Sequence, residues 1–189
     1  MRPIPEERHP PTTLDADLRV ITIPDGKDGV LPAGTMLTVT QSLGTSYTVK
    51  DTRGGKYRVH GEDGPRVGMP RLSESGIQPA AQTVPAIVTA ANKALRAVFD
   101  PEIPVDIVNL GLVHEITIQP LDGGGFAAKV RMGLTSPGCG MGDVLVRDVK
   151  EALGKIQGIM SVDAQVVLFP VWNPYTMMSE AAKLKLGML

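Results

Sequence analysis

The nine residues Leu134-Thr135-Ser136-Pro137-Gly138-Cys139-Gly140-Met141-Gly142 constrain the fold of this chain most, because they separate two different hydrophobic patterns. From Phe126 to Leu134 apolar residues alternate with Lys129 and Arg131, and this period of two predicts a half-buried strand. Beyond Gly142, apolar residues recur at helical spacing, at Leu145, Val149, Ala152 and Ile156. The sequence therefore predicts a strand, a glycine-rich turn and a helix, with Cys139 just ahead of the helix N-terminus.

Cys139 is the only cysteine of the chain and stands between two glycines. The first-turn N–H groups of a helix lack intrahelical partners, and with the helix dipole they favour a thiolate over a thiol. Such a thiolate can be a nucleophile, a redox sensor or a ligand to a soft metal. The alternative is a buried structural cysteine in a turn. The neighbouring glycines and the polar Thr135-Ser136 pair favour a functional site.

Composition limits the classes of partner. A chain of 189 residues with 42% hydrophobic content supports one ordinary domain or two small ones. The net charge of −1 gives no argument for a nucleic-acid or anionic membrane partner, and no apolar run suggests a membrane span or a signal peptide. One cysteine excludes an intrachain disulfide. We expect a cytoplasmic protein that takes any further thiolate ligand from a second molecule.

The pattern of prolines, glycines and apolar residues predicts two domains. Residues 1–17 are rich in proline and charge, which is typical of a mobile arm. Residues 18–72 alternate short strands with turns and predict a small all-β domain, either a barrel or a meander. Residues 73–82 are small and polar and predict a linker. Residues 83–189 predict an α+β domain with the element order α-β-β-α-β-α.

Capping residues set the expected helix ends in the second domain. Thr83 caps the first helix, which is expected to reach Phe99 because Pro101 disfavours helical geometry just before it. Asn173 can cap one final helix, with Pro174 at its first position. The expected apolar side of that helix is formed by Met177, Ala181, Leu184 and Met188. The strands at 112–119 and 126–134 are expected to pair as a hairpin.

A second unusual stretch places Asp100, Glu102 and Asp106 within seven residues on a loop stiffened by two prolines. Three carboxylates so close suit a hard cation or general acid–base chemistry. An Asp before Pro is also a common turn residue, and Asp106 or Asn109 can simply bind loop N–H groups. The structural role is the favoured interpretation.

Two further side chains are ambiguous. His114 is in phase with Leu112, Ile116 and Ile118, which favours a hydrogen-bonded core histidine over a ligand. Trp172 follows a strand end, so it is either a core anchor or a wall of the Cys139 pocket.

Three motifs occur in one order, and together they resemble the iron–sulfur-assembly family that includes the PaaD accessory proteins and the cytosolic iron–sulfur carrier-type proteins. They are Asp100-Pro101-Glu102-Ile103-Pro104, the Leu134 to Gly142 stretch and Trp172-Asn173-Pro174. The tail at 177–184 and the β-rich front are similar to a bacterial branch of that family, often found beside the Suf cluster-assembly machinery. The resemblance covers residues 18–189.

The resemblance implies a maturation factor that helps deliver iron–sulfur clusters to apoproteins and is not an enzyme. By position, Cys139 matches the family's reactive cysteine and is the implied cluster ligand, and Asp100, Glu102 and Thr135 match its other motif positions and are implied to contribute to cofactor binding. One cysteine cannot supply four ligands, so a transient cluster would bridge two protomers or be completed by a small thiol or carboxylates. The implied partners are Suf cluster-assembly proteins, apo iron–sulfur clients and a second copy of the chain.

Two alternatives belong to other classes. One is an adaptor without a cluster, which brings the Suf machinery and its clients together. The other is a cysteine-nucleophile transferase, which needs a base near the sulfur, and His60 and His114 are the candidates.

Overall fold

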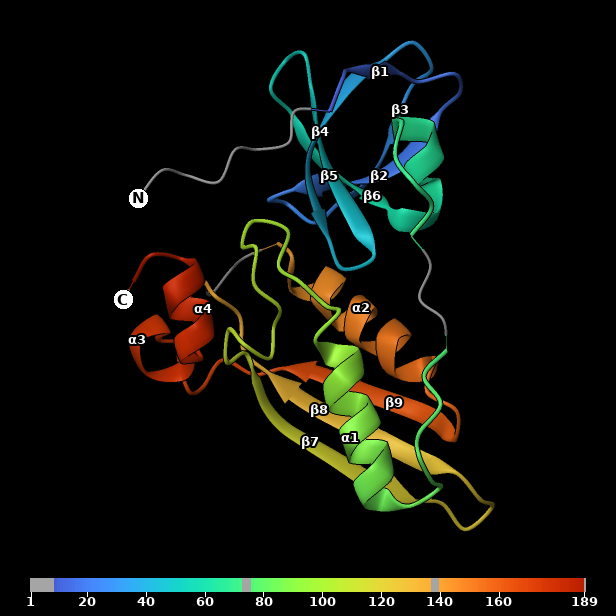
Figure 1. The fold of residues 1–189 in the computed structure, drawn as a ribbon, viewed down its shortest axis with the longest axis vertical. Helices are drawn as coiled ribbons and strands as arrows, with labels where there is room; N and C mark the ends of the chain where they lie inside the picture. Colours follow the sequence, from blue (N-terminus) through green and yellow to red (C-terminus); the bar gives the residue numbers. More distant parts are fainter. Residues whose placement is uncertain (1–8, 73–75, 137–139, 189) are drawn as a thin grey trace. The chain divides into compact units, whose positions relative to one another are not determined.

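The computed structural model describes residues 9–72, 76–136 and 140–188. The chain divides into two compact units, Met1–Glu74 and Ser75–Leu189. Each unit has its own cluster of buried apolar side chains, and Figure 1 shows a β-rich first unit and a second unit in which helices lie against a sheet. The chain is α+β, as predicted.

Six strands of the first unit form one antiparallel sheet in the order β1-β4-β5-β6-β2-β3. The edge strands β1 and β3 do not pair with each other within the described residues, so the sheet is not closed. A 3₁₀ helix, η1 (Gly61–Val67), follows the last strand. The strands are β1 (Thr12–Thr13), β2 (Leu18–Ile23), β3 (Asp28–Leu31), β4 (Met36–Leu43), β5 (Ser46–Asp51) and β6 (Lys56–His60).

Residues 12–14, which were predicted to lie in the N-terminal arm, belong to this unit. Thr12 and Thr13 pair with Leu37 and Met36 of β4, and Leu14 is buried in the core of the unit. Burial of this apolar side chain outweighs the proline-rich composition around it, since removing such a side chain from water contributes about 1.5–3 kcal/mol.

The turn between β5 and β6 is closed by one buried carboxylate. Asp51 accepts hydrogen bonds from the N–H groups of Arg53 and Gly55 and from the Tyr57 hydroxyl. Burial acts to raise the pKa of Asp51, but these hydrogen bonds and the Arg53 charge outweigh it, so the pKa lies below its ordinary value. Asp51 therefore has a structural role in the first unit.

The second unit contains one three-stranded sheet in the order β7-β8-β9. β7 and β8 form the predicted antiparallel hairpin, and β9 runs parallel to β8 after a crossover through α2. The elements are α1 (Val84–Leu95), β7 (Val113–Pro120), β8 (Phe126–Met132), α2 (Gly142–Gly154), β9 (Ile159–Val166), α3 (Pro174–Met177) and α4 (Glu180–Lys185).

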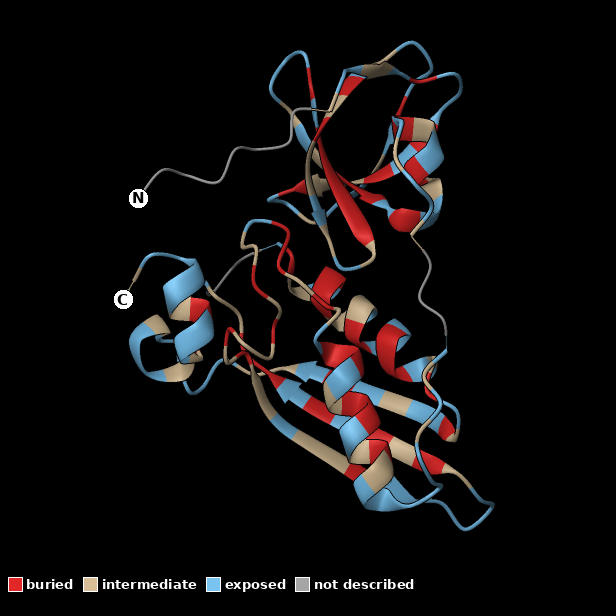
Figure 2. Ribbon diagram, in the orientation of Figure 1, coloured by how far each residue is buried: buried red, intermediate tan, exposed pale blue. Residues whose placement is uncertain are grey.

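Helices α1 and α2 cover one face of this sheet (Figure 1). Along β8 the side chains of Val130 and Met132 are buried beneath them, whereas Lys129 and Arg131 are exposed on the other face. Figure 2 shows this alternation and the buried stripe on the helices. The period-two pattern of the sequence therefore identified the strand and its buried face correctly.

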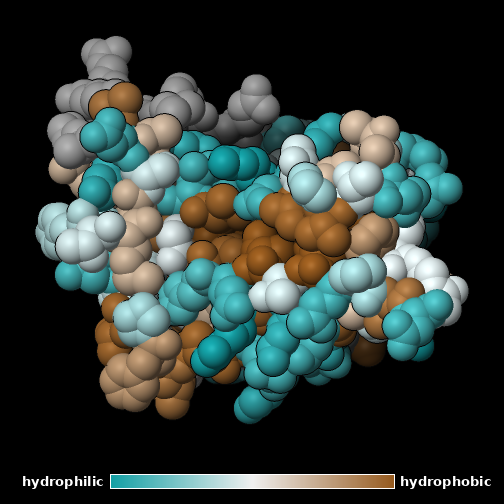
Figure 3. Space-filling model, turned by 90° about the horizontal axis from the view of Figure 1, so that it is seen from below, coloured by the Kyte–Doolittle hydropathy of each residue, from teal (hydrophilic) through white to brown (hydrophobic). Residues whose placement is uncertain are grey.

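The lower edge of the second unit, where β7 and α1 lie in Figure 1, carries an apolar area bordered by hydrophilic residues in Figure 3. Partly buried apolar side chains of these two elements include Val88 and Ile116.

None of the helices in the described parts of the chain has the length and apolar character required to span a membrane.

Helix α1 ends at Leu95, one turn before the predicted end at Phe99. Pro101 restricts only the residue before it, and the chain leaves helical geometry earlier. The N–H groups of Ala97 and Val98 bond to carbonyls three residues back, which tightens the last turn. Phe99 then pairs with Asp106, seven residues further along the chain, so a bridge within the following loop takes the place of the last predicted helical turn.

The final helix is broken into α3 and α4, and its predicted apolar side is only partly right: Met188 packs against the core, but Ala181 and Leu184 are exposed. Met178 adopts extended geometry between the two helices, and Ser179 caps α4 through its hydroxyl, which accepts a hydrogen bond from the Ala182 N–H at 3.2 Å. The break rotates the second half of the segment. Met178 and Ala182 are buried, while Leu184 is 59% exposed.

Candidate functional site

The loop at residues 100–111, called the acidic loop below, contains one buried carboxylate. This is Asp100, with only 4% of its surface exposed. Its Oδ1 accepts a hydrogen bond from the Glu102 N–H at 3.0 Å, which closes a local turn. Its Oδ2 accepts a hydrogen bond from the Thr135 hydroxyl at 3.2 Å. Both oxygens are therefore used to fix the protein's own backbone and side chains.

The Asp100–Thr135 hydrogen bond joins two sequence motifs that are 35 residues apart. Thr135 lies three residues beyond the end of β8, and Asp100 follows the end of α1. A buried carboxylate is costly unless it is hydrogen-bonded, so the pair holds the two loops together. Both residues were predicted as site residues, but the contact between them was not.

Cys139 lies outside the described residues, as do Pro137 and Gly138. On the near side of this gap Ser136 is exposed, and beyond it Met141 is fully buried and helix α2 begins at Gly142. The predicted strand before this stretch and the predicted helix after it are therefore confirmed. The lowered thiol pKa of Cys139 stays a prediction.

The other members of the acidic loop divide into one exposed and one structural side chain. Glu102 is exposed. Asp106 accepts hydrogen bonds from the N–H of Asn109 at 2.9 Å and from its side-chain amide at 2.6 Å. Among the described residues, no group of three or more His, Cys, Asp or Glu side chains is placed to hold a metal ion.

A shallow pocket begins at Thr135 and runs beside the chain that follows β9. Trp172 packs against the core, which confirms the core-anchor interpretation, and it also forms part of the wall of this pocket. Its contact with Cys139 stays a prediction, because Cys139 lies outside the described residues. Its indole N–H donates to the Leu110 carbonyl at 2.7 Å. The pocket is lined by Leu134, Thr135, Val166, Val167, Leu168, Pro170, Val171 and Trp172.

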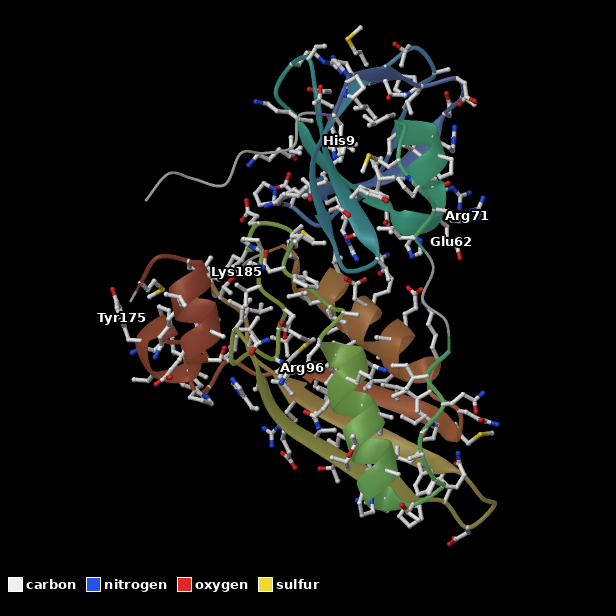
Figure 4. All side chains as sticks on the ribbon, in the orientation of Figure 1. His9, Glu62, Arg71, Arg96, Tyr175 and Lys185 are labelled. Carbon is white, nitrogen blue, oxygen red and sulfur yellow. The ribbon has the colours of Figure 1, made fainter. Side chains whose placement is uncertain are left out.

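The segment beside this pocket exposes large apolar side chains, which the sequence analysis did not single out. Leu168 is 67% exposed, Phe169 78% and Val171 58%. Tyr175 of α3 is 73% exposed and points away from the rest of the second unit in Figure 4. The signal available in the sequence was the apolar run that continues past the end of the strand.

His114 is not the hydrogen-bonded histidine that the sequence predicted. A β-bulge interrupts the pairing between Val113 and Glu115, so His114 is the extra residue of β7. Both ring nitrogens are buried without a hydrogen-bond partner, and the Nε2 end lies against Gly133. Burial, and secondly the Arg131 charge, lower the pKa of His114. His60, the other candidate base, lies on β6 of the first unit.

These features define an α+β domain in which a buried carboxylate binds Thr135, three residues beyond the end of the central strand. Residues 89–166 match the family model described as iron-sulfur cluster assembly protein.

Two relatives of known description each match about half of this chain. An Fe-S protein maturation auxiliary factor of Porphyromonas gingivalis is 38% identical over 97 residues, which are 51% of this chain and 88% of the relative. The Fe-S protein maturation auxiliary factor SufT of Staphylococcus aureus is 42% identical over 90 residues, 48% of this chain and 97% of the relative. The chain therefore belongs to the family of iron–sulfur cluster assembly proteins, and its resemblance to the SufT branch is confirmed.

A crystal structure of a domain of unknown function from Bacillus anthracis is 36% identical, with a TM-score of 0.47. It covers 56% of this chain, and the match includes 95% of that domain.

Proposed function

We propose that this chain is an accessory maturation factor that receives an iron–sulfur cluster as cargo, holds it through Cys139 and passes it to apoproteins. The observation that carries the proposal is the Asp100–Thr135 hydrogen bond, which ties the acidic loop to the segment leading to Cys139. The names of the relatives support the general role in Fe-S protein maturation. The reactive cysteine is our own assignment.

The candidate ligand residues have two different roles: some would bind the cluster, and others fix the protein's own loops. A cysteine thiolate is the ligand that iron–sulfur clusters take in proteins. Asp100 is buried, and both its oxygens accept hydrogen bonds, so we assign it a positioning role. Glu102 is exposed and can complete the ligand set, as can a small thiol or the Cys139 of a second protomer. We propose delivery without catalytic turnover.

An adaptor without a cluster is the second candidate, and the exposed apolar side chains of Leu168, Phe169 and Val171 favour it. Apolar groups gathered on a surface are typical of a protein-binding site. The Suf cluster-assembly proteins and apo clients are the partners that we propose for either function.

Anaerobic cluster reconstitution tests the proposal on wild type, Cys139→Ala, Thr135→Val and Thr135→Ser. Absorption spectra give the bound cluster, and mass in solution gives the oligomeric state. We expect a chromophore on a dimer in wild type and none in Cys139→Ala. Thr135→Val removes the hydrogen-bond donor to Asp100 and should lower the cluster content. Thr135→Ser retains the hydroxyl and should keep the cluster content near that of wild type.

Two outcomes would contradict the carrier. A chromophore that survives in Cys139→Ala would remove the cysteine from the proposed site. The absence of a chromophore in every variant, with Cys139→Ala still supporting client maturation, would favour the adaptor.

A further inference from the structure

We propose that Ser179 and Asn109 are positioning residues, which hold the acidic loop so that Asp100 meets Thr135. This inference rests on the proposed function, because the Asp100–Thr135 pair belongs to the proposed site. It assigns a role to the C-terminal segment, which supplies none of the predicted site residues.

The C-terminal segment is fastened to the far end of the acidic loop, around residues 109–111. The Ser179 N–H donates to the Asn109 carbonyl at 2.9 Å, and the Ser179 hydroxyl donates to Asn109 Oδ1 at 3.0 Å. The Trp172 indole donates to the Leu110 carbonyl at 2.7 Å. Gly111 packs against the Met177 carbonyl so closely that a side chain there would collide with it. Three successive loop residues are thus fixed by one segment.

From Asn109 the contacts continue toward Asp100. The Asn109 side chain donates to Asp106 Oδ2 at 2.6 Å. Asp106 pairs through its backbone with Phe99, and the Ile107 N–H bonds to the Val98 carbonyl at 3.0 Å. Phe99 directly precedes Asp100 in the chain.

The contacts therefore form a continuous path from Ser179 through Asn109, Asp106 and Phe99 to Asp100. The single Asn109 side chain uses its oxygen toward the C-terminal segment and its amide toward the loop. Partly buried polar groups linked in this way stabilise one arrangement of a loop over others. Removal of the hydrogen bond from the Ser179 hydroxyl to Asn109 should therefore make the turn at Asp100 more mobile.

Substitutions at Ser179 can separate this role from helix capping, because its hydroxyl also accepts a hydrogen bond from the Ala182 N–H. Ser179→Asp retains the capping acceptor but cannot donate to Asn109 Oδ1. Ser179→Thr retains both functions. Asn173→Ala is the matched control, since Asn173 caps α3 by accepting from the Tyr175 N–H and lies in the same segment.

Amide hydrogen exchange at Glu102 measures the position of Asp100 directly, because Asp100 Oδ1 accepts from this N–H. We expect exchange about fivefold faster in Ser179→Asp and unchanged in Ser179→Thr and Asn173→Ala. Asn109→Ala should accelerate exchange at Glu102 to a similar extent. The double variant with Ser179→Asp and Asn109→Ala should exchange only slightly faster than Asn109→Ala, because both changes break the same path. Exchange at Val130 in the core should not change in Ser179→Asp, so a general loss of stability is distinguishable.

An unchanged Glu102 exchange rate in Ser179→Asp would overturn the proposal, as would equal acceleration at Glu102 and Val130. Cluster reconstitution of the same variants is the functional measurement, with lower content expected in Ser179→Asp than in Ser179→Thr. If wild type binds no cluster, the proposed function fails, and the exchange data still decide whether Ser179 positions the loop.

Discussion

At the scale of single residues, the burial of His114 is the clearest unfavourable contribution to the stability of the fold. Both its ring nitrogens are buried and unpartnered, and an unsatisfied buried polar group costs about 1–3 kcal/mol. His114→Phe fills a similar volume without the two nitrogens. We expect it to raise the free energy of unfolding of the second unit by about 1 kcal/mol, measured by urea unfolding at pH 8.

The same substitution should change the pH dependence of stability. Burial first, and the Arg131 charge second, place the pKa of His114 below its ordinary 6.5 in the folded protein. The unfolded chain therefore binds the proton more readily, and wild-type stability should fall as pH drops from 6.5 toward the folded pKa, then level off. His114→Phe should lose this component. If the free energy of unfolding varied with pH identically in wild type and His114→Phe, the pH dependence could not be attributed to His114.

At the scale of elements, the contact between the acidic loop and the α3 segment depends on Gly111. Its φ of +75° is rarely adopted by other residues, and a Cβ would collide with the Met177 carbonyl. We expect Gly111→Ala to lower the free energy of unfolding by about 2 kcal/mol or more, combining the left-handed strain with the clash. Urea unfolding measures this loss.

Gly123, in the hairpin turn, is the matched control for that experiment. Apart from its chain neighbours, no atom of the described residues lies within 4 Å of the position where its Cβ would be, so Gly123→Ala should change stability by less than about 1 kcal/mol. Equal effects of the two substitutions would mean that the Met177 contact does not hold the loop.

At the scale of the whole molecule, each unit should fold on its own, because each has a separate core of buried apolar side chains. Ile77, within the expected linker, already bonds to Lys155 and Gln157 of the second unit. A fragment of residues 76–189 should therefore give a ¹H–¹⁵N spectrum that overlays the corresponding signals of the full chain. A collapsed, poorly dispersed spectrum would show that the second unit requires the first.

The sequence by itself determined most of the elements and indicated the residues of the candidate site, because hydrophobic periodicity and capping act over a few residues. The period of two in β8, the start of α1 after Thr83 and the Asn173 cap are all visible locally. The motifs that contain Asp100, Thr135 and Cys139 also indicated the family.

Only the tertiary structure decided how these parts meet. The Asp100–Thr135 bond spans 35 residues and the Ser179–Asn109 bond spans 70, so no local pattern encodes either. The bulge at His114 arises in strand pairing, which overrides local propensity, and the apolar pattern predicted neither the early end of α1 nor the break at Met178.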